Sequence, residues 1–190
     1  MKAVIFNGAR EADPVIDAIE TSMIKLLTEK GWEVEPIILR EKQIAGCLGC
    51  FGCWLKTPGI CVIDDFGREA AKKALLSDLL VLLTPVTFGG YSSELKKALD
   101  RMIPILLPYF DSYKGQIHHK MRYDKYPKLL VIGTNPLNIG HQETFLALTE
   151  RNVLNLRPPK HAASVFQKSE NLDEATRFVD ELLRKVEVIS

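Results

Sequence analysis

The amino-acid sequence predicts an α/β fold, an open and doubly wound parallel sheet of five strands with helices on both faces. Short apolar runs alternate along the chain with amphipathic segments, the pattern of strands separated by covering helices. The run after Asp78 is apolar without interruption up to Leu83, as expected for a strand buried on both sides. A chain of 190 residues fits a single domain, residues 1–190.

Five short segments rich in β-branched and other apolar residues are predicted to be the strands of this sheet. Turn residues or helix-start signals follow them, as expected where a strand ends at the edge of a sheet. The predicted strands are Lys2–Phe6, Trp32–Leu39, Asp78–Leu83, Lys128–Gly133 and Ala162–Phe166.

The helices are predicted from apolar positions that recur on one helical face. The first covers Asp13–Lys30 and stops before Gly31, which favours a helix end. Asp64 and Asp65 open the second helix, which extends to Leu76, because carboxylates are stabilised at the positive N-terminal end of a helix.

Ser92 is expected to cap the third helix, and Pro104 is expected to kink or end it. The apolar side of this helix is predicted to consist of Leu95, Ala98, Leu99, Met102 and Ile103.

Two further helices are predicted over His141–Leu154 and Leu172–Val186. Asn171 followed by Glu174 three residues later resembles a capping box at the start of the last helix. Strands and helices therefore alternate strictly, and a flavodoxin-like strand order accounts for this alternation most simply.

Two segments depart from this alternation. Residues 45–62 hold every cysteine of the chain and form a cysteine-rich insertion. Residues 109–127 show no periodicity, so we expect a long loop, and long loops in compact domains are often functional.

Composition and charge exclude several classes of function. The formal net charge of +1 gives no indication of a nucleic-acid partner or an anionic membrane surface. No apolar stretch approaches the roughly 18 residues that span a bilayer, and the N-terminus lacks a signal-peptide pattern. We therefore expect a cytoplasmic protein, where cysteines more often bind metals or take part in catalysis than form disulfides.

The cysteines are spaced Cys-x2-Cys-x2-Cys-x7-Cys. Gaps of two residues let three thiolates project from one compact turn, as iron–sulfur clusters require. Gly49 and Gly52 allow the backbone to fold tightly there, and the pair Pro58–Gly59 returns the chain for a fourth ligand. The predicted metal ligands are Cys47, Cys50, Cys53 and Cys61.

The same spacing is compatible with three further states of the cysteines. Zinc also binds four thiolates, although usually from two separated pairs. Each Cys-x2-Cys could instead close as a redox disulfide, or the thiols could be reduced and free of metal.

Three segments are predicted to meet at the carboxyl ends of strands, where doubly wound sheets bind ligands. Amides and Arg10 after the first strand suit a phosphate, while the segments after the third and fourth strands suit a flat ring, with Phe88 or Tyr91 against it. Each segment could equally be an ordinary set of turn residues. The candidates are Asn7, Gly8, Ala9 and Arg10; Thr84, Pro85, Val86, Thr87, Phe88, Gly89 and Gly90; and Gly133, Thr134 and Asn135.

Several of these features occur together in a known family. The cysteine run is followed by Val62-Ile63-Asp64-Asp65, by Thr84-Pro85-Val86 with Phe88-Gly89, and then by Ser92, Leu95-Lys96 and Asp100-Arg101. In this the sequence resembles the iron–sulfur flavoprotein branch of the NADPH-dependent FMN reductase and flavodoxin-like families. The resemblance covers most of residues 1–135, whereas the C-terminal third matches in general pattern alone.

The resemblance implies an FMN-dependent oxidoreductase with a 4Fe–4S cluster on the four cysteines. Electrons would come from NAD(P)H or a ferredoxin-type donor, and the protein would be a homodimer or homotetramer with the flavin near a subunit boundary. It assigns no catalytic side chain. The sequence also departs from the family pattern, because Glu11 and Asp13 follow Arg10 without a hydroxyl residue, and Thr87 replaces an aromatic residue. Two alternatives thus stay open, a non-enzymatic electron carrier and a metal- or thiol-based redox or binding module without FMN.

Overall fold

The computed structural model describes residues 1–167 and 171–189. Its centre is a parallel sheet of five strands in the order β2-β1-β3-β6-β7, which confirms the predicted flavodoxin-like sheet. Each strand lies within two residues of its predicted ends. The strands are β1 Lys2–Asn7, β2 Glu33–Ile38, β3 Leu79–Pro85, β6 Lys128–Thr134 and β7 His161–Phe166.

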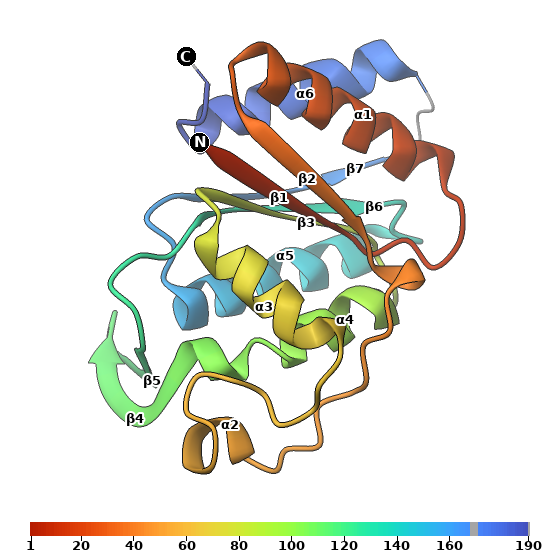
Figure 1. Ribbon diagram of the computed structural model, residues 1–190. Helices are drawn as coiled ribbons and strands as arrows, with labels where there is room; N and C mark the ends of the chain where they lie inside the picture. The colour runs from red at the N-terminus through yellow and green to blue at the C-terminus, as the bar shows by residue number, and fades with distance from the viewer. Residues whose placement is uncertain (168–170, 190) are drawn as a thin grey trace.

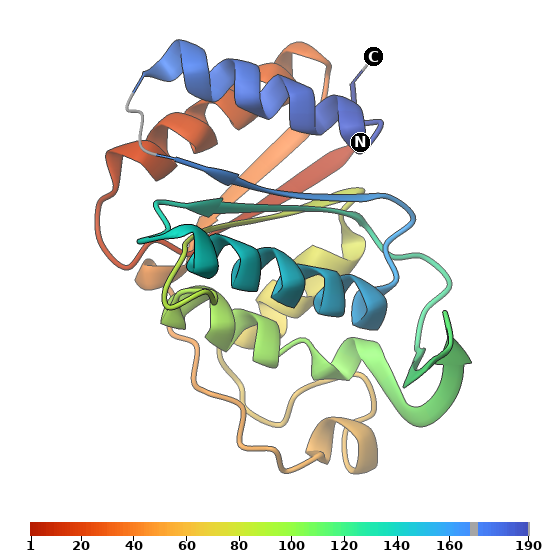
Figure 2. The ribbon, with the colours of Figure 1, turned by 180° about the vertical axis from the view of Figure 1, so that it is seen from behind.

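Helices cover both faces of this sheet, as predicted (Figures 1 and 2). Side chains of β1 alternate between the faces: Ala3 and Ile5 pack with α1 and α6, while Val4 and Phe6 pack with α3, α4 and α5. The helices are α1 Pro14–Glu29, α2 Gly52–Leu55, α3 Phe66–Leu76, α4 Ser93–Asp100, α5 Ile139–Leu156 and α6 Leu172–Lys185.

Most predicted helix ends are confirmed by their caps. Asp65, Ser92 and Asn171 each accept a backbone amide at the start of α3, α4 and α6. The third predicted helix is shorter than expected, since α4 ends at Asp100 and Ile103–Ile105, which contains Pro104, forms a separate 3-10 turn.

The prediction of a long loop at residues 109–127 is wrong in its conformation. The segment contains most of an antiparallel hairpin of β4 Leu106–Tyr113 and β5 Gln116–Met121. Lys114 and Gly115 both have positive φ, 49° and 75°, which suits a two-residue hairpin turn. Both strands are largely exposed or half-buried, so no apolar alternation marks them in the sequence.

None of the helices in the described part of the chain is long and apolar enough to cross a membrane.

Candidate functional site

The three predicted ligand segments meet at one edge of the sheet. Strands β1, β3 and β6 are neighbours, and their registers pair Asn7 with Leu83 and Thr84 with Gly133. The loops that follow them therefore leave the sheet side by side. This juxtaposition places the segments where doubly wound folds bind ligands.

The loop after β1 is tied firmly to its neighbours. The amide of Gly8 donates to the carbonyl of Leu83 (2.7 Å), and the hydroxyl of Ser92 donates to the carbonyl of Gly8 (2.6 Å). A Cβ atom at Gly8 would lie 2.8 Å from the Cβ of Leu95, so glycine alone lets α4 approach the loop this closely. Ala9 donates its amide to the side chain of Asn7 (3.0 Å).

Several candidate side chains at this edge are buried. Asn7 is buried and donates its side-chain amide to Glu20 (2.7 Å), whose pKa is raised by burial. Thr84 accepts the amide of Ser92 (3.0 Å), and Val86 belongs to the core. The hydroxyl of Thr134 is buried and, among the described residues, has no hydrogen-bond partner. It is an unused polar group at the end of β6.

Residues Thr87–Gly90 form a tight turn that presents an aromatic ring. The backbones of Thr87 and Gly90 exchange two hydrogen bonds (2.9 and 2.8 Å), and Phe88 and Gly89 between them have φ of 49° and 77°. An aromatic residue at positive φ is strained, and such strain clusters at functional sites. The side chain of Phe88 is 83% exposed, so it is free to pack against a ligand.

Tyr91, which we predicted as an alternative ring contact, instead belongs to the core. It is 7% exposed, packs edge-on against Phe145 with 5.6 Å between ring centroids, and accepts a hydrogen bond from Asn152 (2.8 Å). Burial raises the pKa of its hydroxyl. The difference arises because α5, whose position the local sequence does not reveal, covers this residue.

The start of α1 is already bonded within the chain. Asp13 caps the helix, and its Oδ1 accepts the amides of Val15 (3.0 Å) and Ile16 (3.3 Å). These amides are among the groups that a helix N-terminus offers to a phosphate. Arg10, in the loop before the helix, is exposed.

The cysteine insertion leaves the sheet edge and forms a separate loop with α2 within it. Figure 1 shows α2 beyond α3 and α4, apart from the strand ends that carry the ligand segments. All four cysteines are free thiols; Cys47 and Cys50 are exposed, whereas Cys53 and Cys61 are buried.

The surroundings of the thiols suit a sulfur-ligated group. The amide of Gly49 donates to the sulfur of Cys47 at 3.4 Å, the kind of contact that stabilises ligand sulfurs. Burial, together with the other three cysteines, raises the pKa of Cys53. Within residues 1–167 and 171–189, no three Cys, His, Asp or Glu side chains are grouped closely enough to hold a metal ion. A four-iron cluster takes one thiolate at each iron, so its ligands stand farther apart than those of one ion.

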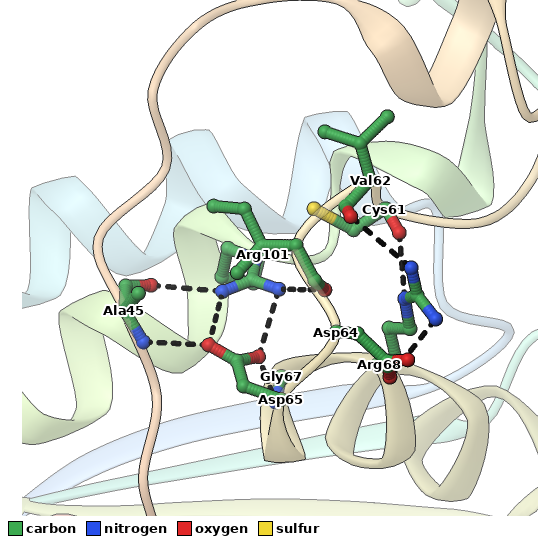
Figure 3. A network of polar contacts seen from close by, with 9 residues as sticks. Ala45, Cys61, Val62, Asp64, Asp65, Gly67, Arg68 and Arg101 are labelled. Atoms are coloured by element: carbon green, nitrogen blue, oxygen red, sulfur yellow. Dashed lines mark hydrogen bonds and ion pairs between the residues drawn. The ribbon is translucent and has the colours of Figure 1, made fainter.

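A buried ion pair closes the neck of this loop (Figure 3). The guanidinium of Arg101 donates to the carbonyl of Ala45 (2.9 Å) before the cysteines and to that of Ile63 (3.0 Å) after them. Asp65 pairs with Arg101 (2.8 Å) and accepts the amide of Ala45 (2.8 Å). The two ends of the insertion are thus held together by Asp65, the cap of α3, and Arg101, at the end of α4.

Arg101 also lies beside a candidate ligand. Its side chain is fully buried, and burial alone would lower its pKa, but the bond to Asp65 and the proximity of Cys61 outweigh burial and raise it. On the solvent side of the same turn, Arg68 donates to the carbonyls of Cys61 (2.7 Å) and Val62 (3.1 Å) (Figure 3).

We expect this neck to loosen in acid. Burial alone would raise the pKa of Asp65, but hydrogen bonds from Arg101, Ala45 and Gly67 outweigh it and leave the pKa below its ordinary value. The pair therefore stabilises the fold fully above the unfolded-state pKa, about 3.9, and this stability is lost as the pH falls through the lower folded-state pKa. Urea unfolding from about pH 7 down to pH 2 should show a slope in this window that is smaller in Asp65→Asn, where the other paired carboxylates still contribute. An unchanged slope in the variant would contradict the assignment.

A column of aromatic rings joins the cysteine loop to the hairpin. Phe51 stacks on Trp54 (centroids 5.3 Å apart), Trp54 contacts His119 (4.9 Å), and His119 stacks on Phe110 (4.4 Å). The indole of Trp54 donates to the carbonyl of Leu106 (3.0 Å). The sequence did not predict this column of rings, because its members come from segments some fifty residues apart and share no pattern. The one local signal was the position of Trp54 next to Cys53.

The sheet order defines an α/β protein of the flavodoxin-like class. The sequence model of the NADPH-dependent FMN reductase family matches residues 1–121. The chain therefore belongs to this family of flavin-dependent oxidoreductases.

Curated relatives match a little more than half of the chain. An iron–sulfur flavoprotein of Methanocaldococcus jannaschii is 32% identical over 109 residues, which is 57% of this chain and 55% of the relative. An iron–sulfur flavoprotein of Methanosarcina thermophila is 26% identical over 103 residues, covering 54% of this chain and 53% of the relative. The chain spans about half the length of these relatives.

Solved structures share the fold over nearly the whole chain. The NAD(P)H:quinone oxidoreductase of Methanothermobacter marburgensis superposes with a TM-score of 0.68 at 14% identity, covering 96% of this chain and 98% of that one. This similarity extends the family fold beyond residue 121, through β6, α5, β7 and α6.

Proposed function

We propose that this chain is a flavin-dependent oxidoreductase whose cysteine loop binds a 4Fe–4S cluster through Cys47, Cys50, Cys53 and Cys61. The observation that carries the proposal is a loop with four free thiols, closed at its neck by a buried ion pair, in a member of a flavin reductase family. Curated relatives that match about half of this chain are named iron–sulfur flavoproteins.

The residues of the chain fit a 4Fe–4S cluster better than they fit FMN. The cysteine loop offers four soft ligands, an amide directed at sulfur and a neighbouring guanidinium, all of which suit an anionic cluster. At the strand ends, the exposed ring of Phe88 suits packing against the ring of a flavin. At the start of α1, a phosphate of FMN would meet the carboxylate of Asp13, which already accepts the amides of Val15 and Ile16.

A cluster transfers single electrons and a flavin transfers one or two, so together they link a one-electron donor to a two-electron acceptor. The contribution of the chain is to hold the cluster ligands at a fixed place and to keep the ring edge accessible beside Phe88. We propose NAD(P)H or a ferredoxin-type protein as donor. Because α2 lies apart from the strand ends (Figure 1), a homodimer or homotetramer would bring the loop of one protomer to the flavin edge of another.

A second candidate function is favoured by the cap of α1. With its helix start bonded to Asp13, the chain could lack the flavin and act as a metal- or thiol-based redox or binding module, or as a simple electron carrier. Anaerobic protein that contains iron and sulfide without flavin, and does not oxidise NAD(P)H when FMN or riboflavin is added, would favour this candidate.

Cluster content tests the leading proposal. We expect anaerobically produced protein, reconstituted with iron and sulfide, to contain about four iron and four sulfide per chain. Cys61→Ser should lose most of both and of the visible absorption near 400 nm, because one of the four thiolates is removed. Lys56→Ala, an exposed change in the same loop, is the matched control and should retain them.

Zinc analysis of the same samples distinguishes the open alternatives. Stoichiometric zinc with no capacity for iron and sulfide would contradict the cluster, as would equal iron content in wild type and Cys61→Ser.

A further inference from the structure

The N-terminus of α1 is capped by the carboxylate of Asp13. Oδ1 of Asp13 accepts the amides of both Val15 and Ile16, so the two groups that would bind a phosphate at this helix are already used. Asp13 holds this place from the cap position, which its backbone geometry and the following Pro14 reinforce. A phosphate could reach these amides only by displacing a carboxylate bonded to both.

The loop between β1 and α1 offers few other groups that could bind a phosphate. The amide of Gly8 is bonded to Leu83 and that of Ala9 to the side chain of Asn7. Glu11 adds a second carboxylate, and Arg10 is the sole cation between β1 and α1. A dianionic phosphate placed here would face two like charges, and charges of equal sign a few ångströms apart repel even when partly exposed.

The ring end of the same edge shows no such obstacle. Phe88 is 83% exposed at the tip of its turn, so its ring is accessible to a ligand. Neutral hydroxyl groups, unlike phosphate, can donate hydrogen bonds to a carboxylate such as Asp13. The edge therefore suits a molecule with a flat aromatic ring and an uncharged polyhydroxyl tail.

We propose that Asp13 makes this site selective for the phosphate-free flavin, riboflavin, over FMN. This inference rests on the proposed flavin function and specifies which flavin the site takes. Asp13 acts in two ways: it occupies the amides that would bind the phosphate, and its charge repels the phosphate.

Flavin titrations of the full-length chain test the proposal. Binding of riboflavin and of FMN is followed by quenching of flavin fluorescence, for wild type, Asp13→Ser and Asp17→Ser. Serine retains the capping ability of position 13 and removes its charge. Asp17 is an exposed carboxylate in the first turn of α1 that bonds neither amide, so Asp17→Ser removes the same charge nearby without changing the group that caps the helix.

We expect wild type to bind riboflavin at least about tenfold more tightly than FMN, a difference typical of one unfavourable charge contact. Asp13→Ser should raise the affinity for FMN by about tenfold or more and leave that for riboflavin nearly unchanged, whereas Asp17→Ser should have a much smaller effect. Raising the ionic strength to about 1 M should strengthen the binding of FMN to wild type, because repulsion is screened, and should not affect riboflavin.

The outcomes separate this inference from the proposed function. If wild type binds FMN as tightly as riboflavin, or if Asp13→Ser leaves the ratio of the two affinities unchanged, the role of Asp13 is refuted while the flavin function stands. If neither flavin binds to wild type or to Asp13→Ser, the flavin function itself is refuted and this inference with it.

Discussion

Replacing Arg101 by methionine should lower the free energy of unfolding by about 3–5 kcal/mol, because it leaves the carboxylate of Asp65 buried without its partner. Arg101 is fully buried and Asp65 is 9% exposed, so water cannot replace the lost contacts. The carbonyls of Ala45 and Ile63 would lose their donor as well. Urea unfolding of wild type and variant measures the difference.

Arg68→Met is the matched control for this change. Arg68 makes comparable bonds to the carbonyls of Cys61 and Val62 and pairs with Asp64, but that carboxylate is 84% exposed (Figure 3). Surface pairs of this kind contribute about 0–1 kcal/mol, so Arg68→Met should change stability little. Equal losses of stability in Arg101→Met and Arg68→Met would show that burial does not make the Arg101–Asp65 pair more stabilising than the exposed pair.

A double variant at the ion pair separates the effect on stability from the effect on cluster binding. Combining Arg101→Met with Asp65→Asn removes both charges and should recover part of the lost stability, since a buried neutral pair no longer carries an uncompensated charge. If the ion pair positions the cysteine loop, the double variant should still bind iron and sulfide poorly although it is folded. Full cluster content in the double variant would limit the pair to a structural role.

The second large effect is expected at Phe145, whose removal should destabilise the fold by about 3–5 kcal/mol. This residue of α5 is fully buried and packs against Tyr91. A Cβ atom at Gly133 would lie 2.7 Å from its ring, so the ring fills the space directly behind the end of β6. Phe145→Ala would leave a cavity under the edge that carries the ligand segments, and chemical denaturation measures the loss.

Phe88→Ala is the matched control at the same edge. The Phe88 ring is 83% exposed, so its removal should change stability by no more than about 0.5 kcal/mol. It should nevertheless weaken flavin binding if the ring packs against the flavin. A large loss of stability in Phe88→Ala, or none in Phe145→Ala, would contradict the assignment of Phe88 to the ligand edge and of Phe145 to the core.

Much of the fold could be predicted because its signals are local. The apolar run ending at Leu83 and the caps at Asp65 and Ser92 indicate strands and helix starts from a few neighbouring residues each. The alternation of elements then restricts the topology to very few arrangements, and the predicted parallel sheet is the one observed. The same alternation brought the segments after β1, β3 and β6 to one edge.

Features that depend on distant partners could not be predicted in this way. The hairpin of β4 and β5 has no buried face to impose an alternating pattern, and Tyr91 is covered by α5. The ring column from Phe51 to Phe110 likewise joins residues far apart in the chain.

Local sequence alone indicated the strands, the helix starts and the spacing of the four cysteines, because periodicity and spacing are properties of neighbouring residues. Which charges meet depends on how the elements pack. Arg101 and Asp65, 36 residues apart, close the neck of the cysteine loop because α3 and α4 pack on the same face of the sheet. Asp13, a carboxylate near a predicted phosphate site, proves to be the cap that occupies this site, since its side chain reaches the amides of Val15 and Ile16 in the folded loop.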